Sequence, residues 1–410
     1  MVGETLPLRP RILRSRPIAA LLTAEVLSTT GSQMTWLALP WFVLTTAGPE
    51  HMAFVVAAEA AGYALFGIPS GALLERLGPQ RTMRLCDAVR APLMLLIPLL
   101  HWKGDLTLPV LVVLTFLLGA AGTPYSAAQH VVVAEILDEN ETDVERANAL
   151  LQGATRLTLL GGPALGGILI VAIGAPSVLL VDAATYLVAF ALVTALVPVA
   201  HAVRTDDPEN DRGLLAGVRC VMRDPLLRGW MGALVLGDTS FSVIFVAIPV
   251  IVYAHYGADP RLAGVFFASW GIGAVAGNVA AYRSDRVGGL RQAAPLVLLQ
   301  AAPLWVLVAS APAAAVAAAL AFSGLANGLV NPTLHAFLTL RPPVALRARA
   351  LTAMSTASSI GTPLALAAAG PAFTIFGSRH VVAVAVAGQC AAMACAALVT
   401  VRHLARERSA

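Results

Sequence analysis

The sequence predicts an all-α polytopic membrane protein with twelve transmembrane helices in two pseudo-symmetric six-helix bundles. Of its 410 residues, 58% are hydrophobic and only 12% are charged, whereas a soluble domain carries roughly 25% charged residues. The chain also contains twelve apolar runs, each close to the ~20 residues that cross a bilayer. A short charged turn lies between two runs of the first half and recurs in the second half, which indicates an internal duplication.

The first bundle is predicted over residues 1–199. Charges and Gly or Pro turns separate its apolar runs, which are rich in Ala, Leu, Val and Gly. Small residues suit membrane helices because lipid gives no hydrophobic drive between helices, so close backbone approach must replace it. The six predicted spans lie near 18–46, 52–75, 82–101, 108–130, 146–173 and 177–199.

A hydrophilic segment, residues 200–227, separates the two halves. It contains an acidic run and then a short amphipathic run, Gly213 to Arg223, and so predicts a cytoplasmic linker with a surface helix. The second bundle is predicted over residues 228–410. Its six spans lie near 228–254, 262–282, 292–310, 313–338, 349–371 and 380–401.

The distribution of arginine predicts the orientation. With the N-terminus inside, the Arg-rich segments fall on the cytoplasmic side, and the opposite side carries only Lys103, Arg261 and Arg379. Cytoplasmic loops are enriched in Lys and Arg. We therefore expect a multi-pass protein of a bacterial-type cytoplasmic (inner) membrane with both termini in the cytoplasm.

Four motifs carry a resemblance to a known family. They are the turn Gly71-x-x-x-Glu75-Arg76-x-Gly78-x-x-Arg81, its counterpart with Asp285, Arg286 and Gly288, the start of span three with Asp87 and Arg90, and the span-five segment Gly162-Pro163-Ala164-Leu165-Gly166-Gly167. With Leu39-Pro40-Trp41, Glu145-Arg-Ala-Asn148 and Asn331-Pro332, they make the chain resemble the major facilitator superfamily over nearly its full length. It is most similar to the macrolide-efflux, Tap-like and enterobactin-exporter subgroup of the drug:proton antiporter branch. The resemblance implies the major facilitator fold and a proton-linked exporter.

The chain departs from the family pattern at three points. Glu75 replaces the usual Asp of the first turn, and the Arg expected in span four is missing from residues 116–122. Ser32 stands where many members of the subgroup have an acid after the Gly of span one. The fold is therefore more firmly implied than the residues that couple protons.

The charged turn has a predicted role as a cytoplasmic gate. Glu75 at the end of span two suits the positive N-terminus of a neighbouring helix, which by resemblance is span eleven near Arg349. The alternative is that these charges only set topology. Gly67 and Gly71 predict close helix contact along span two. We expect an ion network in one layer formed by Arg76, Arg81, Arg84, Asp87 and Arg90.

Polar residues inside several spans predict a central cavity. In span one they recur at helical spacing, and a carboxylate facing lipid is costly, so this stripe should face a cavity. Corresponding polar positions occur in spans two, five, seven and ten. The predicted cavity residues are Glu25, Ser32, Trp36, Glu59, Asn148, Gln152, Arg156, Asp238, Asn327 and Asn331.

Glu25 and Arg156 lie at similar depth, and we hypothesise that they share the cavity and couple substrate to protons. A static structural ion pair is the alternative. Glu59 and Asp238 are rival proton sites, whereas Asp182 in span six is assigned a structural role.

The function predicted from these features is secondary active export of small amphipathic, drug-like or antibiotic-like compounds by proton antiport. Uptake, or export of one dedicated metabolite such as a siderophore or self-made antibiotic, stays open as an alternative. An intramembrane enzyme is disfavoured because the chain lacks a Gly-x-Ser-x-Gly turn, a Cys/His pair and paired acids at metal-binding spacing. The expected partners are a small-molecule substrate, protons and the lipid bilayer, with no nucleic acid, no metal and no cofactor, and a monomeric state.

Overall fold

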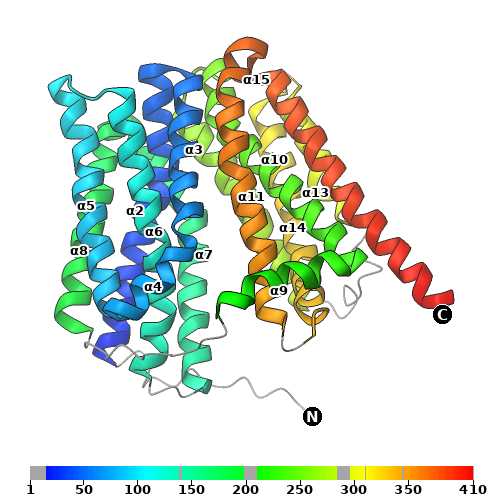
Figure 1. Cartoon of the computed structure of the whole chain (residues 1–410). Coiled ribbons are helices and arrows are strands. Elements are labelled where there is room, and N and C mark those ends of the chain that lie inside the picture. Colours follow the sequence, from blue (N-terminus) through cyan, green and yellow to red (C-terminus); the bar gives the residue numbers. More distant parts are fainter. Residues whose placement is uncertain are drawn as a thin grey trace.

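The computed structural model describes residues 15–137, 141–197, 210–283, 296–309, 311–343 and 346–409. Within these ranges the chain is helical apart from short turns and contains no strand. The helices form two groups that stand beside each other (Figure 1). We call α2–α8 the first lobe and α9–α15 the second lobe. The end of the bundle at which α2 begins and α15 ends is the terminal face, and the opposite end is the far face.

The first lobe contains helices at all six predicted spans. Glycines with positive φ end helices at Gly48 (φ 91°) and Gly78 (φ 77°), and the proline that follows each one begins the next helix. Proline suits this position because the first turn needs no N–H from it. The helices are α2 (Arg16–Ala47), α3 (Pro49–Leu65), α4 (Gly67–Leu77), α5 (Pro79–Lys103), α6 (Leu108–Ile136), α7 (Glu141–Ile173) and α8 (Ala175–Leu196).

The second lobe differs from the predicted spans in two places. The described part of span nine is short and partly 3₁₀, and spans eleven and twelve are two arms of one element that reverses at Gly377 (φ 79°). The elements are α9 (Asn210–Arg223), α10 (Pro225–His255), α11 (Pro260–Arg283), α13 (Leu298–Ala301), η2 (Ala302–Leu307), α14 (Ala313–Leu340) and α15 (Arg347–Ser409).

The two lobes repeat the same packing pairs. In the first lobe α3 packs on α6, and in the second α11 packs on α14. Glycines permit the close approach in both cases, since a Cβ at Gly62, Gly119, Gly273 or Gly324 would collide with backbone oxygens of the partner helix. Small residues at such positions let membrane helices pack backbone to backbone. The contact predicted for Gly67 is wrong, because that residue faces open space.

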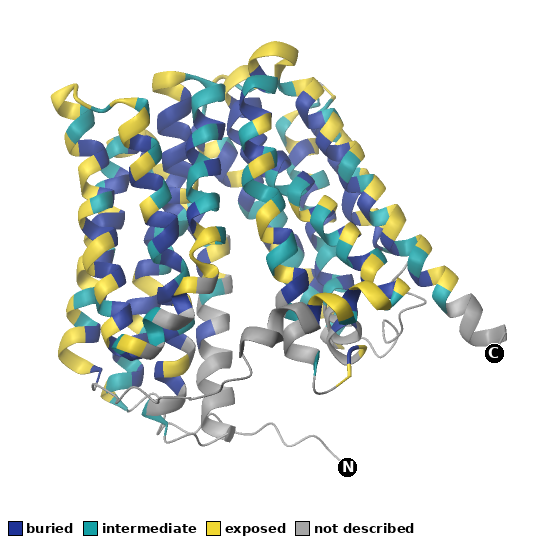
Figure 2. Ribbon diagram, viewed as in Figure 1, coloured by how far each residue is buried: buried dark blue, intermediate teal, exposed yellow. Residues whose placement is uncertain are grey.

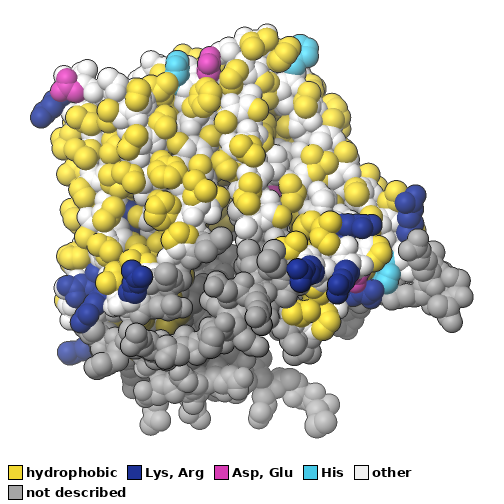
Figure 3. All heavy atoms as spheres, in the orientation of Figure 1, with side chains coloured by type: hydrophobic (Ala, Val, Ile, Leu, Met, Phe, Trp, Pro, Cys, Tyr) yellow, Lys and Arg dark blue, Asp and Glu magenta, His cyan; other side chains and the backbone are white. Residues whose placement is uncertain are grey.

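The outer surface has the character of a lipid-facing surface. Large apolar side chains are exposed in both lobes, among them Leu157 (71% exposed) and Val384 (73%). Figure 2 shows exposed positions along the helices of both lobes. Within the described residues, six helices are long and apolar enough to cross a membrane. On the face seen in Figure 3, Lys and Arg gather mainly at the terminal face, below a broad hydrophobic band. Such a band, flanked by charge, is what a bilayer requires of a multi-pass protein.

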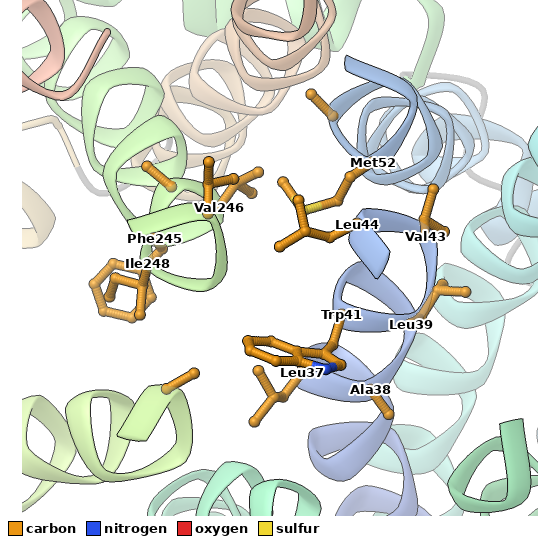
Figure 4. Close-up of a cluster of buried hydrophobic side chains, with 14 of the residues drawn as sticks. Leu37, Ala38, Leu39, Trp41, Val43, Leu44, Met52, Phe245, Val246 and Ile248 are labelled. Atoms are coloured by element: carbon orange, nitrogen blue, oxygen red, sulfur yellow. The ribbon is translucent and has the colours of Figure 1, made fainter. Parts of the chain in front are cut away.

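The lobes share a core at the far half only. One buried cluster joins α2 and α3 of the first lobe to α10 of the second, with Leu37, Leu44 and Met52 near Val246 and Ile248 (Figure 4). Toward the terminal face the buried clusters separate, one wholly within the first lobe and one wholly within the second. The described structure is therefore closed between the lobes at the far face.

Candidate functional site

The second lobe encloses a polar cavity of about 280 Å³. Side chains from α10, α11, α13, α14 and α15 line it, so its shape depends on the packing of the whole lobe. Ligand sites combine apolar walls with a few placed polar groups, and this lining fits that description. It includes Trp230, Asp238, Phe241, Trp270, Gln300, Ser323, Asn327, Asn331, Gln389 and Met393.

A chain of amide hydrogen bonds crosses this cavity. Asn331 Nδ2 donates to Asn327 Oδ1 at 3.0 Å, and Asn327 Nδ2 donates to Gln300 Oε1 at 3.2 Å. Two further polar atoms of the lining, Trp270 Nε1 and Gln389 Oε1, are buried and have no partner among the described residues. A buried polar atom without a partner is costly. Both atoms lie just beneath the lining surface, so a bound molecule would use this donor and this acceptor only after a small shift of the lining.

The predicted cavity residue Asp238 is exposed, and its carboxylate accepts a hydrogen bond from the Ser358 hydroxyl. The sequence reasoning named Asp238, Asn327 and Asn331 but missed Gln300 and Gln389. Gln300 lies in the middle of an apolar stretch of span nine, and Gln389 is the one amide side chain of span twelve, which is the signal that identifies them.

An aromatic cluster connects this cavity to the first lobe. Trp36 of α2 lies 5.7 Å from Phe245 and 5.0 Å from Phe267, measured between ring centroids. Phe245 is in turn 5.3 Å from Trp270, which lines the cavity. The predicted residue Trp36 thus faces the other lobe, and its partly exposed ring (39%) is accessible. Aromatic faces at this junction suit flat or amphipathic organic molecules.

The first lobe contains a buried ion pair. Arg90 donates to Asp87 Oδ1 at 2.6 Å, and its guanidinium lies 4.3 Å from the ring centroid of Tyr125 and 4.4 Å from that of Tyr186. Cation–π contacts on two sides stabilise a desolvated cation. The predicted network in one layer is not formed among the described side chains, because Arg76 and Arg81 are exposed whereas Asp87 and Arg90 are buried and pair with each other. Their positions lie more than two turns beyond the start of α5, which carries them into the lobe.

A second buried carboxylate, Asp182, lies beside this pair. It accepts hydrogen bonds from Thr35 at 2.6 Å and Thr185 at 3.2 Å. A Cβ at Gly31 would collide with the Asp182 carboxylate, so only glycine allows α8 to approach α2 here. Ser32 directly follows Gly31 in the sequence. Asp182 of α8 therefore places a carboxylate next to position 32. Ser32 instead hydrogen-bonds the Tyr186 hydroxyl at 2.9 Å.

Glu25 and Glu59 extend the acidic character of the first lobe. Glu25 is 8% exposed and accepts hydrogen bonds from Thr29 at 2.8 Å and Thr155 at 3.5 Å. Glu59 lies half-buried on α3, close enough to Asp182 for their charges to interact. The side chains of the predicted partner Arg156 and of Asn148 and Gln152 lie outside the described residues, so the Glu25–Arg156 pair stays a prediction.

The predicted gate is described only in part. Arg76 and Arg81 are exposed at the terminal face, and Gly78 forms the turn between α4 and α5. The side chain of Glu75 and the surroundings of Gly71 lie outside the described residues, as do Asp285, Arg286 and Gly288. The proposed contact with span eleven near Arg349 therefore stays a prediction.

The span-five Gly-Pro motif lies where α7 meets two other helices. Gly162 and Gly166 pack against residues 33 and 34 of α2. Gly167 packs against Pro260 of α11, and Gly264 of α11 packs against the backbone of Pro163. The motif is thus an interface between the lobes at the far half.

Comparisons with known proteins agree with this architecture. The family model described as Major Facilitator Superfamily matches residues 21–366. The chain belongs to the major facilitator superfamily. Membership makes it a multi-pass membrane transporter and not an enzyme.

Two curated relatives within the superfamily cover most of the chain. The multidrug efflux pump Tap of Mycobacterium tuberculosis is 23% identical over 363 residues, covering 87% of this chain and 86% of Tap. Tap of Mycolicibacterium fortuitum is 23% identical over 375 residues, with 87% and 88% coverage. A crystal structure of the nucleoside transporter NupG aligns with a TM-score of 0.74 at 10% identity, over 93% of this chain and 99% of NupG. At that identity NupG is similar in fold alone.

Proposed function

We propose that the chain exports small amphipathic organic compounds in exchange for protons. The observation that carries the proposal is the polar cavity of the second lobe, where Trp270 Nε1 and Gln389 Oε1 have no partner among the described residues. Aromatic rings beside it, extending to Trp36, supply apolar contact. The relatives named multidrug efflux pumps support this substrate class.

Proton coupling is assigned to the first lobe. Among its described side chains, the carboxylates of Glu25, Glu59, Asp87 and Asp182 accompany one buried guanidinium, Arg90. Like charges in a medium of low dielectric constant cannot all stay ionised. Intramembrane ionisable residues of this kind mark ion pathways in transporters, so we assign proton binding to this group. Protons supply the energy, with no cofactor.

The proposed orientation places the terminal face in the cytoplasm of a bacterial-type inner membrane. The described arginines at that face support it through the excess of basic residues on cytoplasmic sides. The far-face closure then corresponds to a state open to the cytoplasm, from which an exporter loads its substrate. The first bundle (1–199) and the second (228–410) would rock about the shared far-half core, with 200–227 linking them.

Export in inverted membrane vesicles tests the proposal. An imposed pH gradient is applied to vesicles offered a panel of macrolides, tetracyclines, dyes and siderophores. We expect uptake of several chemically different compounds, stimulated by the gradient and lost when an ionophore collapses it. Glu25→Gln and Asp182→Asn should abolish the gradient dependence while substrate binding persists. Transport of one siderophore alone would indicate the dedicated exporter, and transport indifferent to the gradient would reject proton antiport.

A further inference from the structure

A second, basic cavity lies at the terminal face of the second lobe, apart from the polar cavity described above. Its volume is about 660 Å³, and it lies between the end of α9, the start of α10 and the segment that joins α14 to α15. Arg219 and Arg223 of α9 line it together with Arg341 and Asp224. Three cations and one anion around one cavity give it a net positive charge.

The single aspartate of this cavity is already engaged. Asp224 caps α10 by accepting hydrogen bonds from the backbone N–H groups of Leu226 and Leu227, and it forms an ion pair with Arg341 at 3.0 Å. Arg219 and Arg223 have no ion-pair partner among the described residues. Their charge is therefore available to an anion.

Helix α9 carries these arginines on a strongly amphipathic surface. It lies across the ends of the second-lobe helices in place of running along them (Figure 1). Val221 is fully buried against the lobe, whereas Val218 and Met222 (44% exposed) project outward next to Arg219 and Arg223. A helix with exposed apolar residues beside arginines, at the end of a membrane-spanning bundle, matches the pattern of helices that lie in the lipid interface.

We propose that the basic cavity binds the headgroup of an anionic phospholipid. Arg219 and Arg223 hold the phosphate, and the acyl chains run along Val218 and Met222. A soluble phosphate compound offers the same charge, but it makes no use of the two exposed apolar side chains, so the geometry favours the lipid. Basic pockets next to membrane spans recognise lipid headgroups in this way.

Lipid binding to the purified full-length protein tests the proposal. The probes are short-chain phosphatidylglycerol, phosphatidylcholine with the same chains, and inorganic phosphate, titrated in detergent with native mass spectrometry as the readout. We expect the protein to prefer phosphatidylglycerol. Arg219→Gln/Arg223→Gln should weaken its binding about 30-fold, since each basic residue near an anionic surface contributes about fivefold. Arg402→Gln, an exposed arginine on α15 outside the cavity, is the matched control.

The outcomes separate a lipid site from a site for soluble phosphate and from the absence of any site. Loss of phosphatidylglycerol binding in the double variant, with full binding in the control, supports the lipid site. Equal binding by all three proteins overturns it. Competition by inorganic phosphate at the concentration of the lipid, or undiminished lipid binding by Val218→Ser/Met222→Ser, also overturns it and indicates a soluble ligand. If the double variant does not fold, each single variant should still lose about fivefold, and no loss in either overturns the site.

Discussion

Arg90 shows how a single residue determines the chemistry of the first lobe. Its guanidinium is enclosed by Tyr125 and Tyr186, and Asp87 is its ion-pair partner. Burying both charges costs desolvation free energy. Removing one partner destabilises the protein further, because the other charge then stays buried without a counter-ion.

Removal of one partner should destabilise the protein more than removal of both. Arg90→Gln leaves Asp87 uncompensated and should cost about 3–5 kcal/mol. Asp87→Asn/Arg90→Gln should recover much of that loss. Thermal unfolding of the purified variants in detergent measures both. If the double variant is as unstable as Arg90→Gln, the loss belongs to the Tyr125 and Tyr186 contacts and not to the charge pair.

The free indole N–H of Trp270 should contribute to substrate affinity. Trp270→Phe keeps an aromatic wall but removes the donor, and one hydrogen bond contributes about 0.5–1.5 kcal/mol. We expect Kd to rise up to about tenfold for substrates with a hydrogen-bond acceptor. Binding measured by tryptophan-independent methods, such as radioligand binding, checks it. A substrate without acceptors is the control, and an equal loss for both would assign the effect to ring packing.

At the scale of the elements, prolines and glycines set several helix boundaries, and Asp224 caps α10. The Gly-Pro pairs at 48–49 and 78–79 mark where α3 and α5 begin, three residues before the predicted starts of spans two and three. The burial of Asp87 and Arg90 could not be predicted in the same way. Helix α5 begins at Pro79, before the apolar run of span three, so charged residues that precede this run lie inside the lobe. Asp182 needs α8 to pack on Gly31, a tertiary contact that no local pattern contains.

Asp224 should link the stability of α10 to pH. Partial burial raises the pKa of Asp224, but hydrogen bonds from Arg341 and from the backbone N–H groups of Leu226 and Leu227 outweigh it, so the pKa lies below its usual value. The stabilisation is then present at neutral pH and is lost as the pH falls below the usual carboxyl range.

Two substitutions separate the cap from the charge. Asp224→Ala should cost about 1 kcal/mol through the lost cap, whereas Asp224→Asn keeps the cap and removes the acid dependence. Melting temperatures at neutral and acidic pH measure this. An unchanged acid dependence in Asp224→Asn would assign it to another carboxyl group.

The helix pair α7–α11 should control closure of the far face. Gly264→Val places a branched side chain against the backbone of Pro163, so the lobes can no longer approach there. We expect normal insertion into the membrane, with increased labelling of Cys introduced at Leu44 by a membrane-impermeant thiol reagent from the far side. Gly161→Val, on α7 at a helical position where a side chain would meet nothing within 4 Å, is the control. Unchanged labelling of Gly264→Val would show that α7–α11 contact does not hold the closure.

At the scale of the whole molecule, the duplication organises both packing and proposed function. The fold could be predicted because every helix that crosses a membrane needs a long apolar segment. Such a segment identifies the helix whichever neighbours it packs against. The conformational state was not predictable, since it depends on which half of the lobes shares a core. The helix type of span nine was also not predicted, because an apolar run does not show that its helix becomes 3₁₀ around Pro303.

A crosslink across the lobes should stop transport. Glu50→Cys/Gly370→Cys joins α3 to α15 at a point where a Cβ on residue 370 would lie 2.9 Å from the backbone oxygen of Glu50, in a background that lacks the four native cysteines. Oxidation should form the disulfide and abolish gradient-driven export, and reduction should restore it. Each single cysteine variant is the control. Export that continues with the disulfide formed would show that the far face does not open during transport.

The shared far-half core has a thermodynamic consequence. Opening that side exposes side chains such as Leu37, Leu44 and Ile248, which are fully or almost fully buried now, and each contributes about 1.5–3 kcal/mol by leaving water. The shared core therefore disfavours the state that is open at the far face. Only ligands that bind this state preferentially can raise its fraction, so under the proposed antiport the bound protons or cargo must supply that preference.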